Sequence, residues 1–405
     1  MIRETIAANR ERQLKFLKTL VKTPTDNPPG DCAQAAEVAA KALESLGFTV
    51  ERHAVPEAVA RANGMKSATN LIVRRTFGTG RGTVIALNAH GDVVPPGEGW
   101  TVDPYGAVEK NGALYGRGAA VSKSDFATYA FAVLALEANS AGLNGGIELH
   151  FTYDEEAGGL VGPKWLIDQK LTKATLAISA GFSYAITTAH NGVLHLEVTV
   201  RGKQAHAAMP STGHDALEAT VPVLAAIYGE RKRLAGIKSK EQGIGSPQIT
   251  VGLISGGINT NVVPDRIMLR IDRRIMPEEQ GAEVERALVK LIEGAATGNG
   301  ITVECKRVML AEPLRPLPGV ARLVDAISRN ARAVLGVPVR ATGSPLYTDA
   351  RHYAAAGIPT VLYGAGPRSI LEANAHGADE HLQLSDLAAA TEVVALTLRD
   401  LLQAT

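Results

Sequence analysis

Residues 87–95 read LNAHGDVVP. The apolar residues before His90 predict a buried strand, so an imidazole and the carboxylate of Asp92 stand at its carboxyl end. Sheets of the α/β class build their sites at that end of their strands. His is a common zinc ligand, and an Asp two residues later lies on the same side of an extended backbone, where it can orient the ring. A lone His-x-Asp is more often incidental, so its meaning depends on the segments around it.

Strands and helices alternate on both sides of this stretch. Short apolar or alternating runs predict strands at residues 49–54, 70–75, 83–89, 147–153 and 176–179. Helical spacing of apolar residues predicts helices at 1–21, 32–46, 123–138 and 163–169. This alternation indicates a three-layer α/β domain.

The pattern changes from about residue 191. Alternating strands are predicted at 193–200, 248–253, 266–273 and 301–307, around helices at 214–234 and 279–291. This grouping predicts a separate α+β unit whose sheet has one polar face. A proline-containing linker at 312–319 then leads to a helix at 320–335, a strand at 360–363 and a helix at 384–402. We therefore expect a catalytic domain formed by residues 1–190 and 312–405, with residues 191–311 inserted into it.

The bulk properties narrow the possible partners. The chain has 405 residues, of which 45% are hydrophobic, and a formal net charge of +1. This charge gives no reason to expect nucleic acid or a membrane surface as partner, so a small molecule is the expected ligand. Cys32 and Cys305 are the only cysteines and predict no disulfide framework. The first residues lack the apolar segment of a signal peptide, so a cytoplasmic location is expected.

A second informative segment, residues 151–159, reads FTYDEEAGG. It places Asp154, Glu155 and Glu156 together after an apolar strand. A solvated acidic loop is the simpler interpretation. Adjacent carboxylates resist joint ionisation unless a cation or a raised pKa relieves them. The alternative is therefore metal chemistry, in which one Glu binds a cation and its neighbour is the general base.

A third segment, residues 372–381, reads EANAHGADEH and lies before the last predicted helix. Alone it is a weak signal. With the first two segments it supplies His90, Glu156 and His376. Three protein ligands of this kind are typical of a catalytic zinc site, which keeps a further position open for water.

In this order, the three segments resemble the signature of the di-zinc aminoacylase, desuccinylase and carboxypeptidase G metallopeptidases. The resemblance covers nearly the whole chain. Supporting matches are YGRGA at 115–119, TTAHNG at 187–192, RGKQAHA at 201–207, NVVP at 261–264, RIMP at 274–277 and TDAR at 348–351. It implies a three-layer catalytic domain of the zinc aminopeptidase and carboxypeptidase type. It also implies an inserted α+β, ferredoxin-like lid and dimerisation domain.

The resemblance also implies roles for individual residues. His90 and Glu156 would be metal ligands, His376 the far metal ligand, Asp92 the carboxylate that orients His90, and Glu155 the general base.

The inserted domain would contribute further residues. It would make a homodimer or higher homo-oligomer. His206 would reach the site of a neighbouring subunit and stabilise the tetrahedral intermediate. Asn261 and Arg274 would hold the substrate, the guanidinium of Arg274 being suited to a carboxylate. Without the motif context, ordinary surface polarity would be the simpler interpretation of His206 and Arg274.

Two positions depart from the family pattern. Where the family has an Asp that bridges two metals, the register set by residues 118–123 places Val121. Where the family has a Glu that binds the first metal, the segment ISAGFS at 178–183 places Gly181. Neither residue can bind a cation, and without their charges two divalent ions 3.5 to 4 Å apart lack compensation.

Three outcomes are compatible with these departures. One ion, Zn, Mn or Co, could be held by His90, Glu156 and His376 after some rearrangement, because in the family pattern His90 would serve the other metal. Asp125 or Asp154 could replace a missing ligand. The chain could instead be a catalytically silent binding or assembly protein. The retained base and ligands favour a mononuclear hydrolase that cleaves an amide or related C–N bond in a small carboxylate-bearing substrate. Hydrolytic deamination of an unusual aromatic amine is a further alternative.

Overall fold

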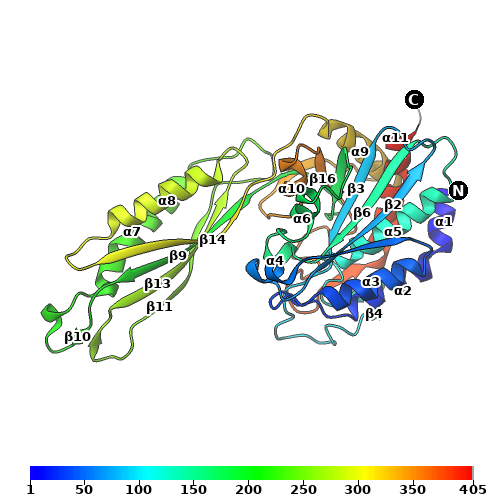
Figure 1. The fold of residues 1–405 in the computed structure, drawn as a ribbon. Helices are drawn as coiled ribbons and strands as arrows, with labels where there is room; N and C mark the ends of the chain where they lie inside the picture. Colours follow the sequence, from blue (N-terminus) through cyan, green and yellow to red (C-terminus); the bar gives the residue numbers. More distant parts are fainter. Residues whose placement is uncertain (404–405) are drawn as a thin grey trace. The chain divides into compact units, whose positions relative to one another are not determined.

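The computed structural model describes residues 1–403 and divides into two compact units (Figure 1). Unit 1 is formed by Met1–Thr188, Pro316–Thr342 and Thr348–Thr405. Unit 2 is formed by Ala189–Arg315 and Gly343–Tyr347. Unit 2 is thus inserted, in sequence, into unit 1.

Unit 1 is built on an eight-stranded mixed sheet, in the order β1-β2-β6-β3-β7-β16-β8-β15. In that order the strands are Val50–Ala54, Thr69–Phe77, Gly145–Thr152, Val84–His90, Leu176–Ser179, Thr360–Leu362, Ile186–His190 and Ala341–Ser344. The central strands β6, β3, β7 and β16 run parallel. Parallel strands are covered on both faces, which explains their nearly continuous apolar sequences.

Helices cover both faces of this sheet. One face carries α5 (Lys123–Glu137), against which α2 (Arg10–Val21) and α11 (Leu384–Leu402) pack. The helices α3 (Ala33–Glu44) and α9 (Val320–Leu335) complete the unit near its edges. The other face carries α6 (Pro163–Asp168) and α10 (Ala350–Ala355). The predicted three-layer α/β fold is confirmed.

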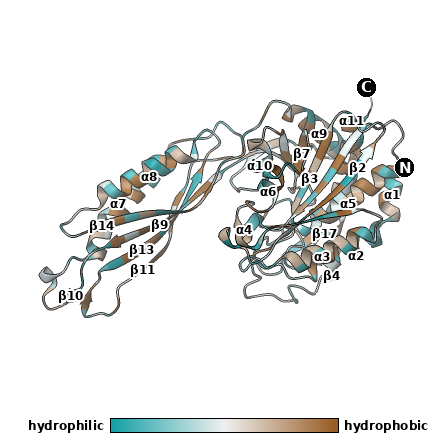
Figure 2. Ribbon diagram, in the orientation of Figure 1, coloured by the Kyte–Doolittle hydropathy of each residue, from teal (hydrophilic) through white to brown (hydrophobic). Residues whose placement is uncertain are grey.

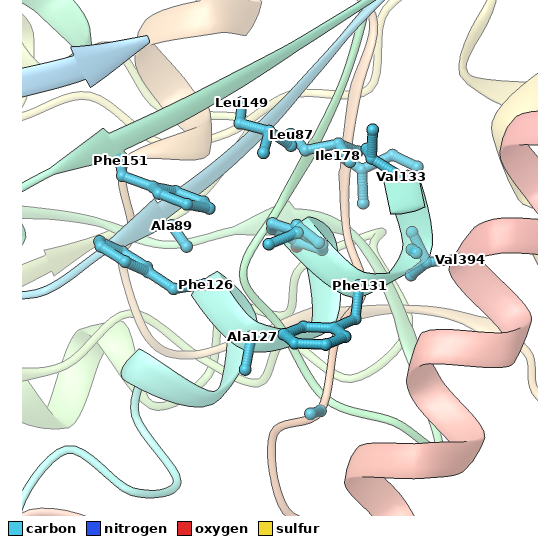
Figure 3. Close-up of a cluster of buried hydrophobic side chains, with 14 of the residues drawn as sticks. Leu87, Ala89, Phe126, Ala127, Phe131, Val133, Leu149, Phe151, Ile178 and Val394 are labelled. Carbon is cyan, nitrogen blue, oxygen red and sulfur yellow. The ribbon is translucent and has the colours of Figure 1, made fainter. Parts of the chain in front are cut away.

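The main apolar core lies between the sheet and α5, as Figure 3 shows. Phe126 of α5 stacks on Phe151 of β6, with ring centroids 3.9 Å apart. Leu87, Leu149 and Ile178 point into the same core from neighbouring strands. This packing fixes α5 and the loop before it against the strands that end at the predicted site.

Unit 2 is a four-stranded antiparallel sheet, β11-β13-β9-β14, with two helices. Its strands in that order are Ile249–Gly256, Arg266–Ile275, Gly192–Arg201 and Thr302–Ala311, and its helices are α7 (Ala216–Leu234) and α8 (Gly281–Ala295). Along β13, buried residues alternate with more exposed ones, as expected of a sheet covered on one face. In Figure 2 α8 carries both hydrophobic and hydrophilic colours, as amphipathic helices do. The predicted inserted α+β fold is confirmed.

The predicted single helix at residues 1–21 is wrong. The chain forms α1 (Ile2–Ala8) and α2, separated at Asn9. The side chain of Asn9 donates a hydrogen bond to the carbonyl of Thr5. Asn side chains compete in this way with regular helical hydrogen bonding, which accounts for the break.

Several short elements were not predicted: α4 (Glu57–Ala62), β8, α10, β15, and a three-stranded sheet of β4 (Val108–Lys110), β5 (Ala113–Tyr115) and β17 (His381–Gln383). Elements this short show no clear periodicity. Within residues 1–403, no helix combines the length and apolarity that crossing a bilayer requires. The cytoplasmic location stays a prediction.

Candidate metal centre

The predicted site lies where two parallel strands of unit 1 end. β3 ends at His90 and pairs in parallel with β6, His90 lying opposite Thr152. The 3-10 turn η1 (Glu155–Ala157) begins three residues after β6 ends at Thr152. Because parallel neighbours end at the same edge of a sheet, the imidazole and the two glutamates reach the same edge.

Three of the predicted site residues form one group, and His376 lies outside that group, beside Glu156. His90, Glu155 and Glu156 each offer one ligand atom, and these atoms lie within 4.8 Å of one another. His376 arrives from the loop before β17, with its Nε2 3.3 Å from Glu156 Oε1. Residues 286 positions apart in sequence are thus brought to one place.

Asp92 connects these residues from behind. It is fully buried, and its carboxylate accepts hydrogen bonds from the backbone N–H of Glu155 (3.2 Å) and of Glu156 (3.1 Å). The side-chain amide of Asn27 donates a further hydrogen bond of 2.9 Å. His90 Nδ1 lies 3.3 Å from Asp92 Oδ1. One carboxylate therefore positions both the imidazole and the turn that carries the two glutamates.

The surroundings of His90 settle which ring nitrogen faces a ligand. Its Nδ1 lies 3.0 Å from the carbonyl oxygen of Asp92, an acceptor, so this nitrogen carries the proton. Nε2 is then the atom available to a metal. Burial lowers the pKa of His90, but the hydrogen bond to Asp92 and the charges of Glu155 and Glu156 outweigh it and hold the pKa well above its usual value.

Glu155 has the properties of a general base. Desolvation raises the pKa of its carboxyl group, and the charges of Glu156 and Asp92 add to this effect against the opposing charge of His90. The result is a pKa of about 7. A base is most effective when its pKa lies near the working pH.

The residues present fit one divalent ion. Glu156 Oε1 is buried and makes no hydrogen bond of good geometry, although His376 Nε2 is 3.3 Å away. A buried carboxylate oxygen without a hydrogen bond is costly unless a cation neutralises it. Two imidazoles and a carboxylate form the donor set that zinc, manganese and cobalt accept.

A second ion of the family type does not fit. Val121 offers only an apolar side chain, and its N–H donates to Glu380 Oε1 (3.1 Å). Gly181 has no side chain, and a Cβ placed there would lie 2.7 Å from the backbone nitrogen of Tyr363 and 2.8 Å from Leu362. A glutamate at this position would therefore require the end of β16 to move.

The two candidate substitute ligands have other partners. The buried carboxylate of Asp125 accepts hydrogen bonds from the backbone N–H groups of Ala365 (2.7 Å) and Gly181. Asp154 Oδ2 accepts one from the N–H of Val161 (2.6 Å), while its Oδ1 has no partner. Neither residue belongs to the group formed by His90, Glu155 and Glu156, and neither has a contact to it such as His376 makes with Glu156. The structure thus gives no support to Asp125 as a replacement ligand.

A buried ion pair that the sequence did not reveal supports the His376 loop. Arg117 Nη1 donates to Glu380 Oε2 over 2.6 Å, and both side chains are almost completely buried. Glu380 Oε1 also accepts from the N–H groups of Ala120 and Val121. Glu380 therefore fastens the loop that carries His376 to the loop before α5. Arg117 belongs to the segment at 115–119 and Glu380 to the segment at 372–381, but no sequence pattern indicated that their side chains form an ion pair.

His206, Asn261 and Arg274, the remaining predicted site residues, belong to unit 2. His206 lies in β10 (Ala205–His206), which pairs with β12 (Val262–Val263), and the N–H of Ala207 donates to the carbonyl of Asn261. His206 and Asn261 are thus neighbours.

Arg274 stands apart from this pair. β13 begins at Arg266, shortly after Asn261, and Arg274 lies near its other end. Ten residues of strand span about 30 Å, so Arg274 and His206 occupy opposite ends of unit 2. Arg274 Nε donates to Asp272 Oδ1 (3.0 Å), and the other oxygen of Asp272 lies 3.0 Å from His195 Nε2.

Comparison with known proteins gives consistent matches. The profile described as peptidase family M20/M25/M40 matches residues 86–400. The succinyl-diaminopimelate desuccinylase of Acidiphilium cryptum is 27% identical over 385 residues, which are 93% of this chain and 95% of that protein.

Solved structures share the fold. An M20 family metallo-carboxypeptidase from Sulfolobus solfataricus superposes with a TM-score of 0.77 at 18% identity, covering 96% of this chain and 98% of that one. A Bacillus subtilis protein described as a dinuclear metal binding peptidase of the M20 family superposes with a TM-score of 0.69 at 17% identity, covering 98% and 100%.

Proposed function

Because the chain belongs to peptidase family M20/M25/M40 and is a metallohydrolase of amide-type bonds, we propose that it hydrolyses a C–N bond in a small carboxylate-bearing substrate. It would use one divalent ion per chain. One observation carries the proposal: ligand atoms of His90, Glu155 and Glu156 lie within 4.8 Å of one another, with His376 3.3 Å from Glu156.

The protein groups divide the chemistry between them. When bound by His90, Glu156 and His376, a divalent ion polarises the substrate carbonyl and lowers the pKa of water. Glu155 removes the proton from the attacking water and later donates it to the leaving amine. A pKa of about 7 suits both steps. His206 of the partner subunit would donate a hydrogen bond to the developing negative charge.

The proposed single ion distinguishes this chain from dinuclear relatives. The Bacillus subtilis neighbour is described as dinuclear. Here, the two positions where the family resemblance places further carboxylates hold Val121 and Gly181. The three ligands that remain suffice for one ion with an open position.

Arg274 is the proposed anchor for a substrate carboxylate. Asp272 binds the Nε side of its guanidinium, which holds the group in place and leaves the two terminal nitrogens for a ligand. A planar fork of two N–H donors matches a carboxylate. Asn261, beside His206, is proposed to bind substrate at the other end of unit 2.

A homodimer through unit 2 is proposed, and the exposed apolar residues of this unit support it. Leu253 and Ile254 are 61% and 55% exposed on β11, an edge strand. Leu217, Val221 and Tyr228 are exposed on α7 at helical spacing. Unpaired edge strands and apolar stripes of this kind are typical of interfaces. Such a dimer would let His206 and Arg274, which one unit 2 holds far apart, serve different sites.

Metal content tests the proposal. Protein purified without added metal, then loaded with zinc, manganese or cobalt, should contain one equivalent by elemental analysis. His376→Ala should lose it, because two remaining ligands bind weakly. Two equivalents in the wild type would contradict the mononuclear site. No metal under any loading would contradict the proposed metal-dependent mechanism.

A substrate panel tests the chemistry. N-acyl amino acids, aryl amides and carboxylate-bearing aromatic amines should be compared for release of the amine or ammonia. The apolar Val121 at the site favours turnover of an aryl compound over a simple N-acyl amino acid, and fast turnover of only the latter would contradict this preference. Glu155→Gln should abolish turnover while metal binding persists, because only the base is removed.

A further inference from the structure

The face of the unit 1 sheet that α10 covers contains charged and polar groups where an apolar core would be usual. Its apolar cluster consists of Ala86, Ala177 and Tyr353, with a few partly buried neighbours. Beside Tyr353, β6 directs Glu148 and His150 into the interior, where they are 3% and 0% exposed. The proposed mechanism gives these residues no task.

Glu148, His150 and Tyr353 form a continuous array. His150 Nε2 lies 3.1 Å from Glu148 Oε2, and His150 Nδ1 lies 2.8 Å from the Tyr353 hydroxyl. Glu148 also binds Arg74 and accepts a hydrogen bond of 2.7 Å from the Thr172 hydroxyl. Burial would raise the pKa of Glu148, but these partners outweigh it and lower the pKa to about 2. The carboxylate therefore stays charged and accepts a hydrogen bond from His150 Nε2, which leaves Nδ1 to accept from the Tyr353 hydroxyl.

An array of buried charged and polar groups is a less favourable filling for a protein interior than apolar side chains, in terms of the free energy of folding. Buried charges seldom stabilise a protein more than apolar side chains of the same volume would. What the array does provide is a directional link, since a hydrogen bond fixes Tyr353, and with it α10, at one position along β6.

The two residues of α10 that precede Tyr353, Arg351 and His352, contact the turn that carries Glu155 and Glu156. Arg351 binds the carbonyl oxygen of Gly158, and His352 Nε2 lies 3.0 Å from the same oxygen. Gly159 approaches so closely that a Cβ there would lie 2.1 Å from Asp349 Oδ1. The N–H of Gly158 in turn donates to the carbonyl of Glu155 (3.0 Å).

We propose that Glu148, His150 and Tyr353 are positioning residues that hold the Glu155–Glu156 turn in its working geometry through α10. Asp92 holds the beginning of this turn by its N–H groups, and α10 holds its end. The inference relies on the proposed function for the roles of the two glutamates, but not for the mechanical link itself.

Tyr353→Phe is the direct test, because it removes one hydroxyl and keeps the ring. Hydrogen–deuterium exchange of the metal-free protein should show faster exchange, by about tenfold, in the peptide covering residues 154–159. Zinc affinity, measured against a chromophoric chelator, should fall about tenfold, as for other supports of metal ligands. On an N-acetyl amino acid or an anilide, whichever the wild type hydrolyses, kcat should fall while KM changes less than twofold.

Tyr129→Phe is the matched control. Tyr129 is also fully buried, and its hydroxyl donates one hydrogen bond of 2.8 Å to the carbonyl of Tyr363. It should lower the melting temperature about as much as Tyr353→Phe, yet leave exchange at 154–159 and zinc affinity unchanged. Equal effects of the two variants on that peptide would overturn the proposal.

Two substitutions of His150 supply a second test. An Asn amide can take the place of Nδ1 and keep the contact to Tyr353, whereas a Gln amide can take the place of Nε2 and keep the contact to Glu148. Residues 154–159 should therefore exchange hydrogen more slowly in His150→Asn than in His150→Gln. The reverse order would contradict the proposal. A wild type that binds none of zinc, manganese and cobalt would refute the proposed function, while the exchange results would still decide the positioning role.

Discussion

Replacing Asp92 by Asn tests the central support of the metal centre. Asn has the same shape but lacks the charge, and one of its two positions carries an NH₂ group. With that group in place of Oδ2, it would face two donors, the side chain of Asn27 and the N–H of Glu156. In place of Oδ1 it faces the N–H of Glu155 at 3.2 Å and His90 Nδ1 at 3.3 Å. The second orientation is preferred, because it keeps the two shorter hydrogen bonds, from Asn27 at 2.9 Å and from Glu156 at 3.1 Å.

The magnitude follows from these contacts. One buried N–H loses its acceptor, and the remaining hydrogen bonds lose a charged partner, which together cost about 3 kcal/mol. His90 keeps the carbonyl oxygen of residue 92 as acceptor at 3.0 Å, so its tautomer survives. Its orientation loses the carboxylate. We expect zinc affinity to fall about 10- to 100-fold, the usual effect of removing such a partner.

The assay combines urea unfolding of the metal-free protein with zinc competition against a chelator. Asp168→Asn is the control, because Asp168 pairs with Lys164 on the surface, with 53% of its side chain exposed. Its effect should stay below about 0.5 kcal/mol. Wild-type zinc affinity in Asp92→Asn would refute the assigned role of Asp92.

Three further predictions address other parts of the molecule. The pKa of Glu148 is lowered from 4.5 to about 2. This shift contributes about 3 kcal/mol of stability above pH 4.5, which is lost as the pH falls towards 2. In urea unfolding, Glu148→Gln should therefore make the stability depend less on pH in this acidic range, and an unchanged pH dependence would contradict the assignment. Val121→Asp should still bind one zinc by elemental analysis, because Gly181 supplies no second carboxylate; two equivalents would show that the bridge alone suffices. Leu253→Lys, on the edge strand β11, should yield monomers in sedimentation. Val308→Lys, on the opposite edge strand β14, should leave the dimer intact. A dimer that survives Leu253→Lys would show that the interface lies on another surface.

Long periodic segments could be predicted from sequence to the residue. The helices α9 and α11 begin and end where the sequence pattern does, because each buries a regular face against the sheet or a neighbouring helix. The break at Asn9 could not be predicted in the same way. It depends on a side-chain hydrogen bond to Thr5, which leaves the apolar periodicity on both sides intact.

Some contacts of the site could also be predicted from the sequence, whereas others could not. His90, Glu155 and Glu156 could be placed together because each directly follows a predicted strand, and neighbouring parallel strands end at one edge. The support of His376 by Arg117 and Glu380 could not, since the pair joins loops 263 residues apart and no spacing encodes such a contact. Nor could the sequence show that Arg274 lies far from His206, because that depends on strand length and pairing in unit 2.

The loss of two carboxylate ligands balances the loss of one divalent ion in net charge. Val121 and Gly181 remove two negative charges relative to the family pattern, the charge of one divalent ion. Two such ions about 4 Å apart repel each other by on the order of 20 kcal/mol at an effective dielectric constant of about 20, so the proposed single ion matches the charge that remains. Asp125 does not restore this balance, because its carboxylate binds the N–H groups of Ala365 and Gly181 and burial raises its pKa to about 7. The hydrogen bond to Asp125 also fixes the backbone at Gly181, the position where the family pattern places a metal-binding glutamate. Reversing Val121 alone therefore leaves the second position without either the charge or the space that an ion needs.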